Sequence, residues 1–194
     1  GAASAHVEHK VVVRGLREAG LERAAAVALL ARAFGMRRKE AILADLVRLQ
    51  REAARGDTIN IQDGTKGGRK GARVPRLVPV TLAVREALSA AAAASPAGSR
   101  NLLRSEETLK DFLATELHAA YRVIKAHGLR KFHDLRAAYA CQRYAELTGH
   151  AAPVLGGTLY RQNPSLDRSA RLQISRELGH GRVDVVAAYI GGRR

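Results

Sequence analysis

Tryptophan is absent from the 194-residue chain, and aromatic residues of all kinds make up only 4% of it. Alanine and leucine therefore supply most of the apolar surface, which favours closely packed helices. Cys141 is the only cysteine, so an internal disulfide and a CxxC metal motif are both excluded. None of the seven histidines has a cysteine or histidine partner at a convincing zinc spacing. We therefore expect neither a metal ion nor another cofactor.

Long apolar runs are also missing. Residues 90–94 form an apolar stretch, but a membrane-spanning helix needs about 20 apolar residues. No segment has the charged start, apolar centre and small-residue end of a signal peptide. The sequence therefore predicts a cytoplasmic protein with no membrane partner.

Acidic residues are few relative to basic ones. Thirty-three lysines and arginines oppose eighteen aspartates and glutamates, which gives a formal net charge of +15 at pH 7. A field of this sign attracts polyanions, and nucleic acid is the commonest such partner because its phosphates release counterions when they are neutralised. The alternatives are an ordinary basic protein and one that touches anionic membrane surfaces.

The pattern of apolar residues predicts a mainly α-helical fold with one small antiparallel sheet, an α+β domain. Apolar residues recur at helical spacing in the following segments: 21–34, 38–50, 82–94, 105–127, 134–148, 170–178 and 183–190. Residues 58–62 and 76–80 alternate as strands do, with a basic, glycine-rich turn at 64–71 between them. Residues 151–168 are rich in loop-forming residues, and we expect a loop there.

Four short segments carry the residue types that phosphoryl chemistry needs. They are Gly35-Met36-Arg37-Arg38-Lys39-Glu40, the turn that contains Lys66, His133-Asp134-Leu135-Arg136, and Leu178-Gly179-His180 followed by Tyr189. Each segment alone is a weak signal, since short motifs occur by chance. All four in this order, with a hairpin between the first and the third, are much harder to obtain by accident.

This ordered set resembles the catalytic domain of the tyrosine recombinase (phage integrase) family. The resemblance runs from about residue 29 to residue 190, and Tyr189 follows His180 at the nine-residue spacing of the family. It implies the integrase catalytic-domain fold and a role in DNA recombination and integration, as in mobile elements. It also implies that six residues are catalytic: Arg37, Lys66, His133, Arg136, His180 and Tyr189.

The chemistry explains these residue types. Attack on a phosphodiester builds negative charge on the nonbridging oxygens, and guanidiniums such as Arg37 and Arg136 bind two oxygens at once. Fixed cations can then do the work of a metal. The resemblance implies that Tyr189 is the nucleophile, which forms a covalent 3′-phosphotyrosine, and that His133 assists as general base. It further implies that Lys66 is the general acid for the 5′ oxygen and that His180 donates a hydrogen bond to the phosphate.

Each assignment has a structural alternative. Arg37 could be an ordinary helix-start residue, Arg136 a helix salt-bridge partner and His133 a packed helix-entry residue. His180 could close a helix after Gly179, and Tyr189 could be a core aromatic. Lys66 competes with Lys70 in the same turn, because residues 71–75 disturb the family frame. Glu40 is expected to orient a cation, and Asp45 could act similarly.

The chain also departs from the family. We expect residues 1–194 to be a single catalytic domain, without the helical DNA-binding domain that usually precedes it, and with only five residues after Tyr189. The gap between Arg136 and His180 is about twenty residues longer than the family resemblance leads us to expect, so residues 151–168 are predicted to be an insertion loop. Double-stranded DNA is the expected partner, with a tetramer for the full-length enzyme, a monomer for the isolated domain, and a bacterial, nucleoid-associated location.

Two other functions fit parts of the sequence. A type IB topoisomerase-like or telomere-resolving enzyme would share Arg37, Arg136 and Tyr189, although the Leu178-Gly179-His180 segment is integrase-like. A non-catalytic DNA-binding protein, such as a decayed integrase or a regulator, would share the charge alone. Substitution of Tyr189 by phenylalanine separates the catalytic from the non-catalytic interpretation.

Overall fold

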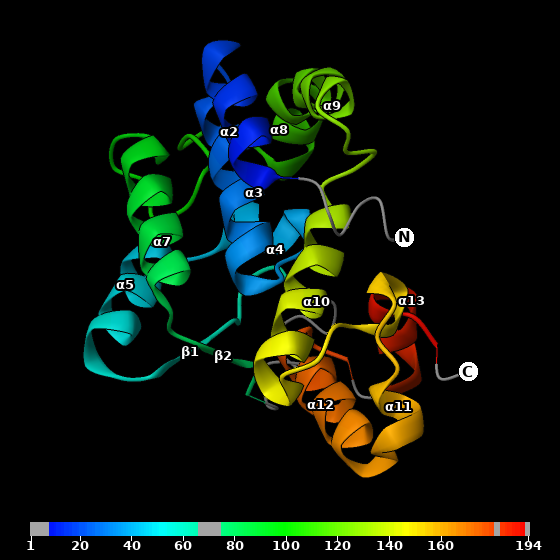
Figure 1. The fold of residues 1–194 in the computed structure, drawn as a ribbon. Helices are drawn as coiled ribbons and strands as arrows, with labels where there is room; N and C mark the ends of the chain where they lie inside the picture. Colours follow the sequence, from blue (N-terminus) through cyan, green and yellow to red (C-terminus); the bar gives the residue numbers. More distant parts are fainter. Residues whose placement is uncertain (1–7, 66–74, 181–182, 193–194) are drawn as a thin grey trace.

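Helices dominate the computed structural model of this chain, which describes residues 8–65, 75–180 and 183–192 (Figure 1). The fold is mainly α-helical with a two-stranded antiparallel sheet, as the sequence predicts. The elements are α2 (His9–Glu18), α3 (Glu22–Phe34), α4 (Arg38–Leu43), α5 (Leu46–Arg55), β1 (Thr58–Asn60), β2 (Leu77–Pro79), α7 (Leu82–Ala94), α8 (Leu109–Ala114), α9 (Glu116–Ala126), α10 (Asp134–Thr148), α11 (Leu159–Gln162), α12 (Pro164–Glu177) and α13 (Ala187–Ile190), with 3-10 turns at Pro153–Leu155 and Val183–Val186.

Helix α3 is the central helix of the N-terminal half. It is apolar on nearly all sides, and it packs against α2, α7 and α10 (Figure 1). Gly35 ends α3 with φ = 71°, a left-handed conformation that favours glycine. A Cβ atom at this position would lie 2.7 Å from Tyr139 Cδ1 and 2.8 Å from Leu178 Cδ2. Glycine is therefore required here both by the backbone and by the close approach of α10 and α12.

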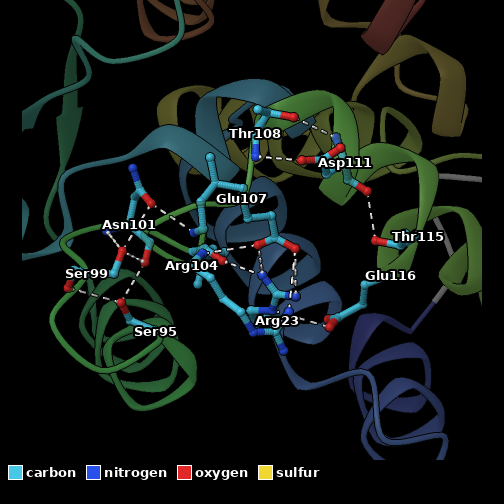
Figure 2. A network of polar contacts seen from close by, with 12 residues as sticks. Arg23, Ser95, Ser99, Asn101, Arg104, Glu107, Thr108, Asp111, Thr115 and Glu116 are labelled. Carbon is cyan, nitrogen blue, oxygen red and sulfur yellow. Dashed lines mark hydrogen bonds and ion pairs between the residues drawn. The ribbon is translucent and has the colours of Figure 1, made fainter.

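A buried ion-pair network fixes the start of α3 to α8 and α9. Figure 2 shows Arg23 between the carboxylates of Glu107 and Glu116. The Arg23 guanidinium also donates to the Leu102 carbonyl at 2.9 Å and lies over the Phe112 ring at 4.7 Å. The backbone N–H of Ala24 donates to Glu116 at 2.8 Å. Glu107 also pairs with Arg104 at 3.5 Å, so two carboxylates are matched by two cations, and the contacts of Arg23 join segments about 80 to 90 residues apart.

The sheet pairs Thr58 with Pro79, Ile59 with Val78 and Asn60 with Leu77. Ile59 and Val78 face the core, so the strands alternate as expected but are shorter than 58–62 and 76–80. The Asn60 side chain accepts a hydrogen bond from the backbone N–H of Arg76 at 2.9 Å, which fixes Arg76 just before β2. Lys66 and Lys70 lie outside the described residues.

Two long helices predicted from the sequence are each divided in two. In the segment 38–50, α4 ends at Leu43, and Asp45 begins α5 by accepting from the backbone N–H of Arg48 at 3.0 Å. In the segment 105–127, α8 is capped by Thr108, and Thr115 separates α8 from α9. Local capping and contacts with other segments override the apolar spacing at both breaks.

The expected loop at 151–168 is partly helical. It contains the Pro153–Leu155 turn, α11 and the first residues of α12. The loop prediction is wrong for these stretches, because Asn163 caps α12 by accepting from the Leu166 N–H at 3.1 Å and Pro164 occupies its first turn. Helix α2 was not expected. Within 8–65, 75–180 and 183–192, no helix is both long enough and apolar enough to cross a membrane.

Candidate active site

Arg37 lies in the turn between α3 and α4. It is the N-cap residue of α4, and its backbone N–H donates to Glu40 Oε1 at 2.8 Å while its Nη1 donates to Glu40 Oε2 at 3.1 Å. This double contact is a capping box in which a carboxylate serves the backbone and a guanidinium together. The Arg37 side chain keeps 19% of its surface exposed, so it can still reach a ligand.

Glu40 is a buried carboxylate shared by three arginines. It pairs with Arg37, with Arg76, and more loosely with Arg136 at 3.8 Å. Its side chain has no exposed surface. Buried charges are costly unless they are paired, and this cluster leaves two positive charges without a carboxylate among the described residues. The cluster is therefore a centre of excess positive charge, and the expectation that Glu40 orients a cation agrees with its contacts.

Arg136 comes from the first turn of α10 and is fully buried. Its Nη1 donates to the Gly35 carbonyl at 2.6 Å, and its Nη2 donates to the Leu178 carbonyl at 3.1 Å. Its Nε has no hydrogen-bond partner among the described residues. Burial and then repulsion by Arg37 lower the pKa of Arg136 to about 10. The guanidinium thus remains cationic at neutral pH and joins the ends of α3 and α12.

Tyr189 and His180 meet on the Arg136 guanidinium. Arg136 Nη2 lies 3.4 Å from Tyr189 Oη and 3.2 Å from His180 Nε2. The guanidinium carbon of Arg136 lies 5.4 Å from the centre of the Tyr189 ring. The centres of the His180 and Tyr189 rings are 6.1 Å apart. Tyr189 is buried on α13, which packs against α10, so its hydroxyl is directed at the arginine cluster and its ring still contributes to the core.

His133 precedes α10 and is exposed. Its ring lies 5.2 Å from the Tyr189 ring, centre to centre. Partial desolvation, followed by repulsion from Arg136 and Lys131, lowers the pKa of His133 to about 4. The imidazole is therefore neutral at pH 7 and can accept a proton.

Arg76 is a buried part of the cluster that the sequence did not single out as a site residue. Its Nε donates to the Glu177 carbonyl at 2.8 Å, and its Nη2 donates to the Gly35 carbonyl at 3.3 Å. Burial lowers its pKa, and the charge of Glu40 opposes that shift. Arg76 therefore ties the hairpin to both helix ends that hold the site. The only sequence signal was an arginine at the start of the second predicted strand.

Glu177 was also missed. Its buried carboxylate accepts hydrogen bonds from Tyr139 at 2.6 Å and from Arg143 at 2.7 and 2.9 Å. These bonds fix the end of α12 directly before the Leu178-Gly179-His180 segment. Asp45, in contrast, caps α5 and pairs with the exposed Arg100, so the cation that it orients lies at the surface.

Five of the six predicted site residues thus form one cluster, in which four surround the guanidinium of the fifth. Arg37, His133, His180 and Tyr189 gather near Arg136, and the sixth, Lys66, lies outside the described residues. The part of the chain that the structure describes contains no group of three His, Cys, Asp or Glu residues that could hold a metal ion. The arrangement presents fixed cations, a phenol and a neutral imidazole to one location.

A comparison with protein families places the chain in a family. A family described as Integrase matches residues 2–142, which is most of the chain. The protein therefore belongs to the integrase family, the phage integrases or tyrosine recombinases. This membership implies DNA as the partner and a general role in site-specific recombination or integration. The match includes Arg37, His133 and Arg136 but ends before His180 and Tyr189.

No curated protein and no solved structure matches the chain. The roles of His180 and Tyr189 therefore depend on their contacts with Arg136 and on the sequence motif.

Proposed function

We propose that the protein cleaves and rejoins DNA strands through a covalent 3′-phosphotyrosine at Tyr189, as a site-specific recombinase. The observation that carries the proposal is the excess positive charge around Glu40 and Arg136, with the Tyr189 hydroxyl 3.4 Å from the Arg136 guanidinium. An electropositive centre beside a potential nucleophile suits a phosphodiester, whose charge rises as it is attacked.

In the proposed cleavage step, Tyr189 Oη attacks the phosphorus and a new O–P bond forms. The bond from phosphorus to the 5′ oxygen breaks, and the phenol proton passes to neutral His133. The 5′ oxygen leaves as a hydroxyl after taking a proton from Lys66, or from Lys70 if that lysine occupies the position. The bond energy stays in the protein–DNA link, so the reverse attack by a 5′ hydroxyl reseals the strand without ATP.

The remaining residues stabilise the charge that develops on the phosphate. Arg37 and Arg136 bind the nonbridging oxygens, and His180 donates a hydrogen bond to one of them. Glu40 holds Arg37 and Arg136 in place at 3.1 and 3.8 Å. Residues 1–194 act as the catalytic domain, 151–168 are an insertion within it, and the full-length enzyme assembles as a tetramer on DNA in the bacterial nucleoid.

The test is covalent capture on DNA of undefined sequence. The chain is incubated with duplexes of randomised sequence that carry a nick, so that cleavage releases a short fragment and traps the adduct. We expect protein–DNA adducts that survive denaturation by detergent, and none from Tyr189→Phe. Equal amounts of adduct from both proteins, or none from either, would overturn the proposal and favour a non-catalytic DNA-binding protein.

A further inference from the structure

A groove of about 460 Å³ opens beside the candidate active site. It is lined by four cations, one imidazole and one phenol: Arg37, Arg38, Lys39, Lys131, His133 and Tyr121. None of the lining residues is a carboxylate. Because Arg37 and His133 belong to both places, the groove continues directly from the site.

Tyr121 holds the Arg38 side chain in position within this groove. Its hydroxyl accepts a hydrogen bond from Arg38 Nη1 at 2.8 Å. Its ring meets the Phe132 ring edge-on, with centres 5.5 Å apart, and Phe132 is buried. An exposed arginine normally loses side-chain entropy when it binds a ligand, and holding it beforehand reduces that cost. Arg38 is therefore set in place by packing that begins in the core.

Helix α9, which carries Tyr121, is held in place by contacts with the N-terminal helices. Glu116, the first residue of α9, pairs with Arg23 at 3.3 Å and accepts from the N–H of Ala24 at 2.8 Å (Figure 2). Helix α9 also packs against α2 and α3. The distance between Tyr121 on α9 and Arg38 on α4 is thus set by the buried network rather than by the two side chains alone.

The field in the groove is positive. Apart from desolvation, the main causes that lower the pKa of His133 are the cations Arg136, Lys131 and Arg37, opposed by Asp134. Two of these cations line the groove. A cavity with this lining attracts an anion more strongly than scattered surface lysines do.

We propose that this groove is a second phosphate subsite, in which Arg38, held by Tyr121, and Lys131 bind the DNA backbone phosphate next to the one that Tyr189 attacks. The identity of the neighbouring phosphate rests on the proposed function. The subsite fixes the register of the strand over the active site, because backbone contacts position a duplex without reading its sequence.

The test compares variants of the full chain on a short duplex of mixed sequence, titrated over a range of salt concentrations. Arg38→Met removes one phosphate contact, so the slope of log K against log salt should fall by about 0.9. Tyr121→Phe keeps the ring packing but releases Arg38, and we expect binding to weaken about threefold, a typical cost for one hydrogen bond. Arg85→Met on α7 and Tyr160→Phe on α11 are the matched controls, since both residues lie outside the groove.

The outcomes separate this subsite from the chemistry. If Arg38→Met and Tyr121→Phe lower affinity more than their controls do, the subsite is supported whether or not Tyr189 forms an adduct. If both variants match their controls in affinity and in salt slope, the subsite is refuted even when the wild-type chain still forms adducts. Thermal melting of each variant in the absence of DNA checks that the fold is retained.

Discussion

Two arginine centres in this protein have different charge balances. Around Arg23, two carboxylates, Glu107 and Glu116, meet two guanidiniums, because Glu107 also pairs with the exposed Arg104 (Figure 2). Around Glu40, three guanidiniums meet one carboxylate. In the first centre the charges balance, and its contacts join α3 to α8 and α9. The second has two more cations than carboxylates, and this difference favours the second centre as the one that receives an anion.

The neighbours of the two centres differ in the same sense. Near Arg23 lie a carbonyl and the Phe112 ring, which are partners for packing. Near Arg136 lie the Tyr189 hydroxyl and the His180 imidazole, which can take part in proton and phosphoryl transfer. Charge excess and reactive groups therefore coincide at one of the two centres only.

The largest expected effect comes from Arg136→Lys. A lysine keeps the charge but loses the planar fork that contacts Gly35 and Leu178 and that we propose binds the phosphate. We expect covalent adduct formation to fall by about 10³-fold, the scale known for arginines that stabilise phosphoryl transfer. The measurement is the rate of adduct formation on nicked duplexes. Arg23→Met serves as the control, and it should keep the wild-type rate at a temperature where it stays folded. Equal losses in the two variants would contradict the distinction between the centres.

The Arg23 centre should contribute to the stability of the fold. Arg23→Met removes the buried cation that the partly buried Glu107 and Glu116 share and leaves Glu107 only its exposed partner Arg104. We expect a loss of about 3 kcal/mol in the free energy of unfolding, the lower end of the usual cost of breaking a buried pair. Urea unfolding measures it. Arg100→Met, which breaks an exposed pair with Asp45, should cost less than about 1 kcal/mol. A loss in the Arg23 variant no greater than that in the Arg100 variant would show that the network does not stabilise the fold.

Anion binding sharpens the comparison further. Inorganic phosphate should stabilise the wild-type chain by about 2.7 kcal/mol when its concentration is about 100 times the dissociation constant. Thermal melting with and without phosphate gives the effect. Arg136→Lys should reduce the increase in melting temperature, whereas Arg23→Met should keep it. If the increase is the same in all three proteins, the excess charge around Glu40 is not the anion site.

The smallest effect concerns pH. The pKa of His133 is about 4 in the folded chain, below its ordinary value of 6.5. Between these values the unfolded chain binds a proton that the folded chain does not, so stability should rise with pH from about 4 to 6.5. Because the ring is exposed, the effect is modest. The free energy of unfolding, measured at several pH values in this range, should depend less on pH for His133→Asn than for the wild type. An identical dependence on pH in the two proteins would be evidence against the lowered pKa.

Much of the fold follows from local patterns, as two helices illustrate. The segments 82–94 and 134–148 were predicted with the bounds that α7 and α10 have. Thr81 caps α7 and Gly149 ends α10, so the signals at the termini agree with the apolar spacing between them. Where the apolar spacing and the signals at the termini coincide, the sequence alone predicts the bounds of a helix.

The breaks in other helices depend on distant segments. The N–H of Leu46 donates to the Arg100 carbonyl at 2.8 Å, and the N–H of Leu102 donates to the Ile42 carbonyl at 3.2 Å. These bonds satisfy the backbone between α4 and α5 from a segment more than 50 residues away. No spacing rule within 38–50 contains that information.

The candidate site divides in the same way. Motifs identified Arg37, Arg136 and Tyr189, because each has a recognisable neighbour in sequence. The role of Arg76 was not predictable, since its carbonyl partner Glu177 lies 101 residues further along the chain. The assignment of Lys66 rests on the motif alone and stays a prediction.

The most direct test of the central claim is to locate the covalent bond by mass spectrometry. Adducts trapped on nicked duplexes are digested with nuclease and protease, and the peptide that carries a nucleotide is sequenced. Our account predicts a 3′-linked nucleotide on Tyr189, absent from Tyr189→Phe and strongly reduced in Arg136→Lys. A nucleotide on another residue, or an unmodified Tyr189 in protein that has cleaved DNA, would contradict it.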